Sequence, residues 1–322
     1  MANSQRCVVL GGNGFLGQRL CQRLVESGFL VRSISRSGRP NGEAERWQSQ
    51  VEWLAAPMGT ESSSKALRDA DLLFHLASTT LPATSDANVA YDLESNVSAT
   101  VRVLEAASRS VRRLIFVSSG GTVYGIAREN LISESHPTDP ICPHGIHKLA
   151  IEKYLQLYRL MKGLDSIVLR VSNIYGESQD CNKPLGAVAH FTARAVNGVP
   201  IEIWGDGTTT RDYIHVDDVV CALTRAMWYE GAERLFNIGT GRGVSLCQLV
   251  EMLRQQLSQP VKVEYRARRY FDVPENVLDN SRAKRELSWA PQIALELGLE
   301  RMLRRAQTSP GGGNRVCSVA SS

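Results

Sequence analysis

The 322-residue chain lacks any apolar run close to the roughly 20 residues that cross a bilayer, so we expect no membrane-spanning segment. It also lacks a strong excess of charge of one sign. The 37 basic and 33 acidic residues give a net charge of +4, too mild and too scattered for a protein that binds nucleic acid. A modest basic excess does suit a protein that handles small anions. The polar first six residues lead through an apolar run straight into a glycine turn, so we expect no secretory signal.

Cysteine is sparse and shows no pairing pattern. The seven cysteines are odd in number, widely spaced and form no C-x-x-C pair. Most lie in apolar surroundings, which favours small buried hydrophobic side chains. We therefore expect a reducing, cytoplasmic location, and we expect no metal site. The cysteines are Cys7, Cys21, Cys142, Cys181, Cys221, Cys247 and Cys317.

The first half of the chain alternates short β-branched runs with helical patterns. Strands separated by helices of this length form right-handed βαβ units and a parallel sheet. The sequence therefore predicts an α/β fold with a Rossmann-type, doubly wound parallel sheet. We predict strands at 7–10, 29–35, 72–76, 114–118 and 166–171, and helices at 15–27, 89–108 and 144–162.

After Gly176 the pattern changes to Gly- and Pro-containing connections between shorter elements. We predict a Rossmann domain at 1–176 with parts of 205–240, and a smaller C-terminal α/β substrate-binding lobe, mainly 177–306. The Gly- and Ser-rich residues 307–322 have no periodicity and are predicted to be a disordered tail. Ligands of open α/β sheets bind at the carboxyl ends of the strands, so we expect the active site between the lobes. The predicted elements of this lobe are strands near 201–204 and 261–265 and helices near 217–229 and 245–257.

A glycine-rich turn follows the first predicted strand and opens the first predicted helix. Gly11 permits the tight turn, Gly14 lets the backbone approach a pyrophosphate, and Gly17 lets the helix pack on the strand. Phe15 and Leu16 begin the helix, whose N-terminal amides are donors to phosphate. The G-x-x-G-x-x-G spacing is the one used by short-chain dehydrogenase/reductases, and we expect it to bind a nicotinamide dinucleotide.

The end of the second predicted strand bears on the choice between NAD and NADP. A carboxylate there usually binds the adenosine ribose of NAD, but this strand ends in Ser35 and Arg36. These residues suit a 2′-phosphate, whereas Arg36 as a solvated surface charge would leave NAD possible. The cofactor is therefore NAD or NADP, undecided.

From residue 6 to residue 303 the chain resembles the extended short-chain dehydrogenase/reductases, specifically the sugar-nucleotide epimerases of the UDP-glucose 4-epimerase type. The motifs after the glycine turn are 75–79 (HLAST), Asn96, 118–125 (SSGGTVYG), 144–152 (HGIHKLAIE), 169–176 (LRVSNIYG), 203–207 (IWGDG), 211–218 (RDYIHVDD), 236–239 (FNIG) and 272–274 (DVP). The resemblance implies a nucleotide-sugar substrate, a role in polysaccharide biosynthesis, and a homodimer formed through the two helices predicted at 89–108 and 144–162.

The resemblance also implies a catalytic pair on one helix. The family uses a tyrosine as base and, four residues later, a lysine that holds the cofactor ribose; residues i and i+4 share a helical face. Lys148 matches the lysine, but His144 stands where the tyrosine is expected. The family's hydroxyl donor falls on Gly120, so Ser119 and Thr122 are the nearest candidates.

Three interpretations of His144 stay open. In the first, the neutral imidazole replaces the tyrosine as base, and the nearby Lys148 favours that neutral form. In the second, the site is catalytically weakened and the chain binds nucleotide ligands without turnover. In the third, His144 lies away from the substrate, and His147 or a water molecule relays protons.

Further site residues are implied by the same motifs. Arg211 and Arg269 are matched to arginines that bind the substrate diphosphate, as guanidinium groups do well. Arg211 pairing with Asp217, or Arg269 lying on a solvated basic face, are the alternatives. Asp217 and Asp218 lie where a helix begins and are expected to cap it and to interact with its N-terminal dipole. The remaining matched residues are Leu76, Ala77, Ser78, Asn96, Ser118 and Lys148 for the cofactor, and Asn173 and Asp272 for the substrate.

The resemblance implies C4 epimerisation of a UDP-hexose or its N-acetyl form through a transient keto intermediate. No carboxylate accompanies Thr122 to assist elimination, so dehydration is disfavoured. The alternatives are an NADPH-dependent reductase of a nucleotide-linked keto-sugar and a non-catalytic nucleotide-binding protein on the same scaffold.

Overall fold

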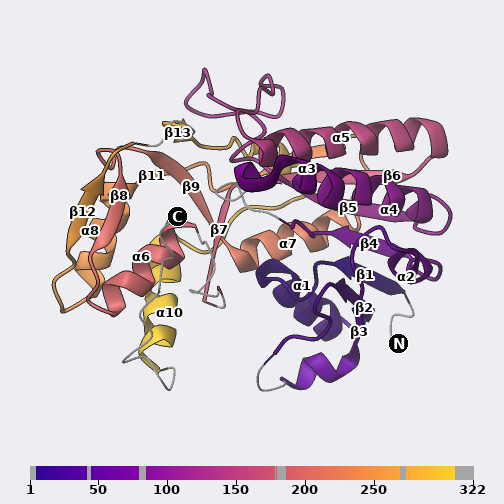
Figure 1. Ribbon diagram of the computed structural model, residues 1–322, viewed down its shortest axis with the longest axis horizontal. Helices are drawn as coiled ribbons and strands as arrows, with labels where there is room; N and C mark the ends of the chain where they lie inside the picture. Colours follow the sequence, from indigo (N-terminus) through magenta and orange to yellow (C-terminus); the bar gives the residue numbers. More distant parts are fainter. Residues whose placement is uncertain are drawn as a thin grey trace.

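A seven-stranded parallel sheet forms the centre of the molecule, with strand order β10-β6-β5-β4-β1-β2-β3 (Figure 1). The structure is a computed structural model that describes residues 5–41, 45–79, 85–177, 179, 186–268 and 273–308. The predicted doubly wound α/β fold is confirmed. The strands of the large sheet are β1 (Arg6–Leu10), β2 (Leu30–Ser35), β3 (Val51–Ala55), β4 (Leu72–His75), β5 (Arg113–Ser119), β6 (Asp165–Val171) and β10 (Leu235–Ile238).

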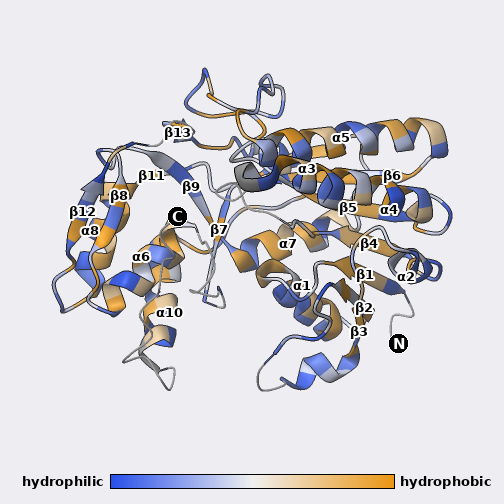
Figure 2. Ribbon diagram, in the orientation of Figure 1, coloured by the Kyte–Doolittle hydropathy of each residue, from blue (hydrophilic) through white to orange (hydrophobic). Residues whose placement is uncertain are grey.

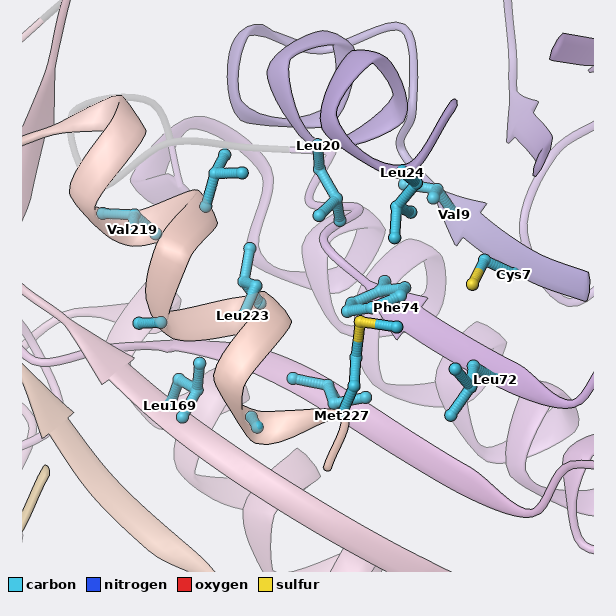
Figure 3. Close-up of a cluster of buried hydrophobic side chains, with 14 of the residues drawn as sticks. Cys7, Val9, Leu20, Leu24, Leu72, Phe74, Leu169, Val219, Leu223 and Met227 are labelled. Atoms are coloured by element: carbon cyan, nitrogen blue, oxygen red, sulfur yellow. The ribbon is translucent and has the colours of Figure 1, made fainter. Parts of the chain in front are cut away.

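Helices cover both faces of this sheet. On one face α1 (Phe15–Glu26) and α7 (Val216–Ala226) pack on strand residues such as Val9 and Phe74 (Figure 3). On the other face α4 (Ala99–Ala107) and α5 (Pro143–Lys162) pack on the alternate strand residues. Strands buried on both sides are apolar at nearly every position, as Figure 2 shows for the centre of the sheet.

The segment predicted as one helix at 89–108 is helical with an irregularity near its start. It consists of α3 (Val89–Asp92), a π-helical turn η3 (Leu93–Ser98) and α4. π-Helical turns are rare and occur often at functional sites. The prediction at 144–162 coincides with α5, where Pro143 occupies the first turn and Gly163 ends the helix with φ of 69°.

Smaller sheets and three helices form a second layered region beside the large sheet (Figure 1). β9 pairs with β7, β11 and β13, and β8 pairs with β12. Their core includes side chains of all three helices. The elements are β7 (Asn173–Tyr175), β8 (Ile201–Trp204), β9 (Thr210–His215), β11 (Gly243–Ser245), β12 (Val263–Arg266), β13 (Glu275–Asn276), α6 (Ala187–Val196), α8 (Leu246–Gln256) and α10 (Leu295–Thr308).

The predicted tail needs a correction at its start. α10 continues to Thr308, so the disordered tail predicted for 307–322 does not begin at 307, and its remainder from 309 lies outside the described residues. α10 ends directly before the Gly- and Ser-rich residues, so composition did not mark the last residue of the helix. β10 joins the large sheet beside β6, but the domain boundary at 176 remains a prediction.

None of the described helices combines the length and the apolar character that a membrane span requires.

Short elements complete the fold. The short elements are η1 (Arg46–Gln50), α2 (Glu61–Lys65), η2 (Ser85–Asn88) and α9 (Ser281–Glu286).

Candidate active site

The glycine turn connects β1 to α1 at the carboxyl edge of the large sheet. Gly11 has φ of 86°, and its amide donates to the carbonyl of Ile34 at 2.8 Å. A Cβ at Gly11 would lie 2.9 Å from the backbone N of Ala77, and a Cβ at Gly17 would collide with the carbonyl oxygen of Gly11. The turn therefore excludes side chains at these positions, and it keeps the backbone open toward a ligand.

The N-terminus of α1 points its amides toward this edge. Gly14 is the N-cap residue, and among the described residues no side chain caps the helix there. The first turn contains no acidic residue. Unsatisfied amides and the positive end of the helix dipole form a site for an anionic group. The glycine cradle and this helix end together fit the pyrophosphate of a dinucleotide.

The end of β2 lies beside the glycine turn. Ser35 Oγ donates to the carbonyl of Gly38 at 2.9 Å, and Asn13 Nδ2 donates to Ser37 Oγ at 2.8 Å. Arg36 is exposed in the same turn. Residues 35–39 read Ser-Arg-Ser-Gly-Arg and contain no carboxylate. The turn after β2 therefore presents hydroxyl and guanidinium groups beside the glycine turn.

The residues that follow β4 lie next to the glycine turn. The amide of Leu76 donates to the carbonyl of Leu10 at 3.0 Å, which continues the sheet contact. Asn96, in the π-helical turn, accepts from the amide of Thr79 at 2.9 Å and donates to its hydroxyl at 2.7 Å. Asn96 therefore fixes the loop that contains Ala77 and Ser78.

Lys148 extends from α5 to the carboxyl end of β5. Its Nζ donates to the carbonyl of Val117 at 2.9 Å and lies 4.8 Å from the centroid of the Phe116 ring. The residue is only 8% exposed. Burial lowers the pKa of Lys148 to about 8, while the carboxylates of Glu152 and Asp92 oppose that effect. The ammonium is therefore charged at neutral pH and is available to a ribose hydroxyl.

His144 lies one turn before Lys148 on the same helix and is also 8% exposed. Burial, followed by the Lys148 charge, lowers the pKa of His144 to about 3, whereas Asp92 acts in the opposite direction. The imidazole is therefore neutral at pH 7, with a nitrogen lone pair that can accept a proton.

Candidate hydroxyl groups gather beneath the first turn of α5. Thr122 Oγ1 is buried and has no partner in the described part of the chain, and a Cβ at Gly145 would lie 2.6 Å from the Thr122 carbonyl. An ideal Cβ on Gly121 lies 3.9 Å from both Ser119 Oγ and Asn173 Nδ2. The structure therefore brings Ser119, Thr122 and Asn173 together.

Gly120, which aligns with the family's hydroxyl position, has no space for a side chain. A Cβ there would lie 2.5 Å from Cδ1 of Leu278. A serine or threonine at this position would require Leu278 to move. The packing explains why the candidate hydroxyls are the neighbouring residues.

Ser118 belongs to a buried polar network that joins β5, α5 and β6. Its Oγ donates to Glu152 at 2.5 Å, and Glu152 forms a buried ion pair with Arg170 at 2.6 Å. The guanidinium lies 4.8 Å from the centroid of the Tyr124 ring, and Tyr124 donates to Asn237 at 2.6 Å. Sequence reasoning did not identify this network, although Glu152 lies four residues after Lys148 on one helical face.

The predicted substrate residues lie on β7 and β9. Asn173 Nδ2 donates to the carbonyl of Asp212 at 3.3 Å, and the Arg211 guanidinium donates to the carbonyl of Thr210 at 2.9 Å and reaches Pro274. Arg269 and Asp272 lie outside the described residues.

Asp217 and Asp218 lie in the first turn of α7, where their charges suit the helix dipole as expected, but neither of them caps the helix. His215 caps the helix by accepting from the Asp217 amide. Asp217 pairs with Arg19 at 2.7 Å, and Asp218 accepts the amides of Gln292 and Ile293. Both carboxylates are thus used for contacts between elements that are distant in the sequence.

These features define the class of protein: an α/β dinucleotide-binding protein with a lysine, a neutral histidine and hydroxyl groups at the edge where a nicotinamide would lie. Residues 7–239 match the family described as the NAD dependent epimerase/dehydratase family, and the chain belongs to this family.

Two relatives and one solved structure illustrate the similarity. The UDP-glucose 4-epimerase of Mycolicibacterium smegmatis is 35% identical over 302 residues, covering 91% of this chain and 96% of the relative. A dTDP-4-dehydro-6-deoxyglucose reductase of Escherichia coli is 30% identical over 310 residues, covering 94% and 98%. The structure of the Thermotoga maritima UDP-glucose 4-epimerase with UDP-glucose has a TM-score of 0.86 and 32% identity, covering 94% of this chain and 99% of that chain.

Proposed function

We propose that this protein is an NAD(P)-dependent epimerase of a nucleotide-linked sugar, acting at C4 of a UDP-hexose or UDP-N-acetylhexosamine. The observation that carries the proposal is the position of Lys148 and His144 at the same sheet edge as the glycine cradle. The family assignment and the similarity to UDP-glucose 4-epimerases support it. A bound nicotinamide would supply the acceptor that takes hydride from the sugar carbon and returns it.

The roles of the cofactor residues follow from this proposal. The glycine turn, with Phe15 and Leu16 at the helix start, would hold the pyrophosphate, and Lys148 would hold the ribose next to the nicotinamide. Residues 76–78 would line the cofactor, held in place by Asn96.

On the substrate side, Asn173 and Arg211 would bind the diphosphate of the nucleotide sugar. The guanidinium fork suits phosphate oxygens. Arg269 and Asp272 are proposed for the same ligand from their sequence motif alone.

His144 is proposed as the base. When hydride leaves the sugar carbon, the hydroxyl proton passes to the neutral imidazole, and it returns when the hydride does. Ser119 and Thr122 would donate hydrogen bonds to the sugar oxygen. The free Thr122 hydroxyl supports this role, because a buried hydroxyl without a partner is costly unless a ligand satisfies it.

A second candidate function is reduction of a nucleotide-linked keto-sugar with NADPH. The specific observation in its favour is the end of β2, where Ser35 and Arg36 stand in place of a carboxylate and suit a 2′-phosphate. The reductase relative in Escherichia coli adds weight to this alternative. The cofactor is then consumed, whereas an epimerase returns it unchanged.

One assay separates these functions. Purified protein is incubated with UDP-glucose, UDP-galactose and their N-acetyl forms in the presence of NAD or NADP, and separately with a nucleotide-linked keto-sugar and NADPH. Products and nicotinamide absorbance are followed in both. Interconversion of the sugars without net absorbance change is the expected result. Stoichiometric loss of NADPH with a nucleotide-linked keto-sugar would instead indicate the reductase. Binding of both ligands without any turnover would contradict both and leave a non-catalytic nucleotide-binding protein.

We also propose that the protein is a homodimer built on α5 and the neighbouring segment 89–107. The outer face of α5 carries apolar side chains at helical spacing, all of them exposed in a single chain. A second copy of this chain fits such a stripe, because a two-fold axis brings the same stripe of both copies together. The exposed residues of the stripe are Ile146, Tyr154, Leu157, Leu160 and Met161.

The cellular setting follows the same reasoning. The thiols of Cys7 and Cys21 are free and buried, which supports the proposed reducing cytoplasm. Burial raises the pKa of Cys7 to about 12, so its thiol is unreactive. The product would be a nucleotide sugar for transferases that assemble polysaccharides.

A further inference from the structure

A second buried titratable pair lies beside His144. His147, three residues later on α5, places Nδ1 2.8 Å from Oδ2 of Asp92. Asp92 is 1% exposed and His147 is 6% exposed. The roles proposed above use neither side chain. Burying a carboxylate costs free energy unless other groups bind it, so its contacts indicate its role.

Two elements hold the Asp92 carboxylate in place. Asp92 is the last residue of α3, where the chain enters the π-helical turn. Asn96 donates from Nδ2 to the carboxylate and, at 3.1 Å, to the carbonyl of Asp92. The same Asn96 holds Thr79 in the loop predicted to line the cofactor. The carboxylate is therefore fixed between α5 and the proposed cofactor wall.

The carboxylate also fixes the form of the His147 ring. An Nδ1–H group donating to Asp92 leaves the lone pair of the neutral ring on Nε2. A carboxylate in this position orients an imidazole and stabilises the imidazolium that forms when Nε2 takes a proton. His147 is thus arranged to receive a proton, while its partner keeps the charge from being isolated.

His144 and His147 are close enough to act together. Residues three apart on a helix have neighbouring side chains, about 5–6 Å between Cβ atoms. Three charged or titratable groups act on the pKa of His144: Lys148 and His147 from α5 lower it, and Asp92 from α3 raises it. Asp92 is the only one of these three that favours a proton on His144.

We propose that the Asp92–His147 pair holds the proton that His144 removes from the sugar hydroxyl. The hydroxyl O–H bond breaks as hydride leaves the sugar carbon, and the proton bonds to one ring nitrogen of His144. The other ring nitrogen of His144 releases a proton through one water molecule to Nε2 of His147. His147 becomes an imidazolium beside the Asp92 carboxylate, and the protons return by the same route when hydride returns. His147 and Asp92 are therefore positioning residues that act through His144.

This inference rests on the proposed function and addresses a weakness in it. An imidazole that resists protonation, as His144 does, is a poor base on its own, because the proton that it accepts is held weakly. His147 adds a second imidazole that is paired with the Asp92 carboxylate, an arrangement that stabilises an imidazolium. The carboxylate of this pair stabilises an imidazolium, whereas the positive charge of Lys148 opposes one.

The test uses Asp92→Asn, which keeps the size and one hydrogen-bonding oxygen but removes the charge. Glu105→Gln is the matched control, because Tyr158 of α5 donates to Glu105 of α4 at 2.6 Å across the same pair of segments, far from His144. Steady-state kinetics on the responsive nucleotide sugar, cofactor affinity and melting temperature are measured for both. At pH 6, well below the pKa of Lys148, we expect Asp92→Asn to lower kcat about 100-fold while KM and cofactor affinity stay within about twofold. Glu105→Gln is expected to leave kcat unchanged.

A second variant and a second readout keep the outcomes distinct. His147→Ser should reproduce the kcat loss of Asp92→Asn. The double variant should lose no more activity than either single variant, because both substitutions disable the same Asp92–His147 pair. Nitrogen-15 NMR of the unliganded protein should show His147 with its proton on Nδ1.

Several results would overturn the proposal. They are equal kcat in Asp92→Asn and Glu105→Gln, a His147 proton on Nε2, or losses of kcat, cofactor affinity and melting temperature that run in parallel. Failure of both site variants to fold would assign the pair a structural role and would also overturn it. A wild-type protein without any turnover overturns the proposed function first, whereas active wild type with an indifferent Asp92→Asn overturns this inference alone.

Discussion

At the scale of single residues, the site depends on two nitrogen bases that share one buried helical face. Burial disfavours charge on both His144 and Lys148, and each charge would further oppose the other. Lys148 remains cationic at neutral pH because two carboxylates offset part of the burial cost, whereas His144 becomes neutral. One face of α5 thus provides a cation for the cofactor and a lone pair for the substrate.

The pKa of Lys148 gives a pH-dependent prediction. Its pKa falls from 10.5 to about 8 in the folded protein, so the ammonium is present below pH 8 and is lost above it. We expect affinity for NAD(P) to be constant at neutral pH and to fall by up to about tenfold per pH unit above pH 8. Folding stability has the opposite trend: between pH 8 and 10.5 the unfolded chain binds more protons at Lys148, so this group's contribution becomes less unfavourable as pH rises.

Isothermal titration at a series of pH values measures this affinity. Lys148→Met should bind weakly at every pH, and its affinity should lack the loss above pH 8. The exposed Lys153, on the same helix, provides the control as Lys153→Met, which should follow the wild-type curve. Affinity that stays constant through and above pH 8 in the wild type would contradict the role of Lys148.

Some of these residues could be predicted from the sequence and others could not. Lys148 and His144 follow from motif and spacing, because neighbours on one helix have fixed relative positions. Asp92, Glu152 and Arg170 were not predicted as partners, since their pairing depends on how α3, α5 and β6 pack. The proposed roles of the predicted site residues remain predictions.

At the scale of secondary-structure elements, α5 has two functions on two faces. Its buried face carries His144, His147 and Lys148, while its outer face carries the exposed apolar stripe. Periodicity predicted the helix, and the structure assigns each face. The π-helical turn at Leu93–Ser98 could not be predicted in this way, because a single extra residue in a turn leaves the apolar pattern almost unchanged.

The outer stripe leads to a prediction about assembly. Leu157→Glu places a charge in the centre of the proposed dimer interface, twice because of the two-fold symmetry. We expect the dimer dissociation constant to rise at least about 100-fold, since an unpaired buried charge is costly.

Sedimentation velocity over a concentration series measures this change. Leu297→Glu, on α10, is the control, because Leu297 is 42% exposed and Leu157 is 43% exposed. The control should sediment as the wild type does. A wild-type protein that is monomeric at all concentrations, or equal effects of both variants, would contradict the proposed interface.

At the scale of the whole molecule, contacts distant in sequence join the large sheet to the second region. Gly176 lies over Phe15, where a Cβ would approach the ring to 3.3 Å. The buried Asp212 of β9 accepts from Thr240, which follows β10, at 2.8 Å and from Leu278 at 3.3 Å. These contacts place β7 and β9, with Asn173 and Arg211, beside the cofactor cradle.

The sequence predicted this arrangement only in outline. The alternation of strands and helices predicted the parallel sheet, because buried parallel strands are continuous apolar runs. Among the elements that it missed are the helix α6 and the strands β3, β7, β9 and β10. These strands are short or mixed in polarity, so that pairing rather than pattern defines them. The capping of α7 by His215 was missed for a similar reason: the preference for aspartate at helix starts is weaker than the tertiary contacts of Asp217 and Asp218.

The most direct test of the account is the turnover number of the His144 variants in the C4 epimerisation of a UDP-hexose. His144→Ala removes the proposed base and should lower kcat by about 10²- to 10⁴-fold, with cofactor affinity and melting temperature retained. His144→Tyr should give no large gain, because the wild-type site already has its base. If His144→Ala keeps wild-type turnover, or His144→Tyr raises it by orders of magnitude, then His144 is not a working base and the account of the site is wrong.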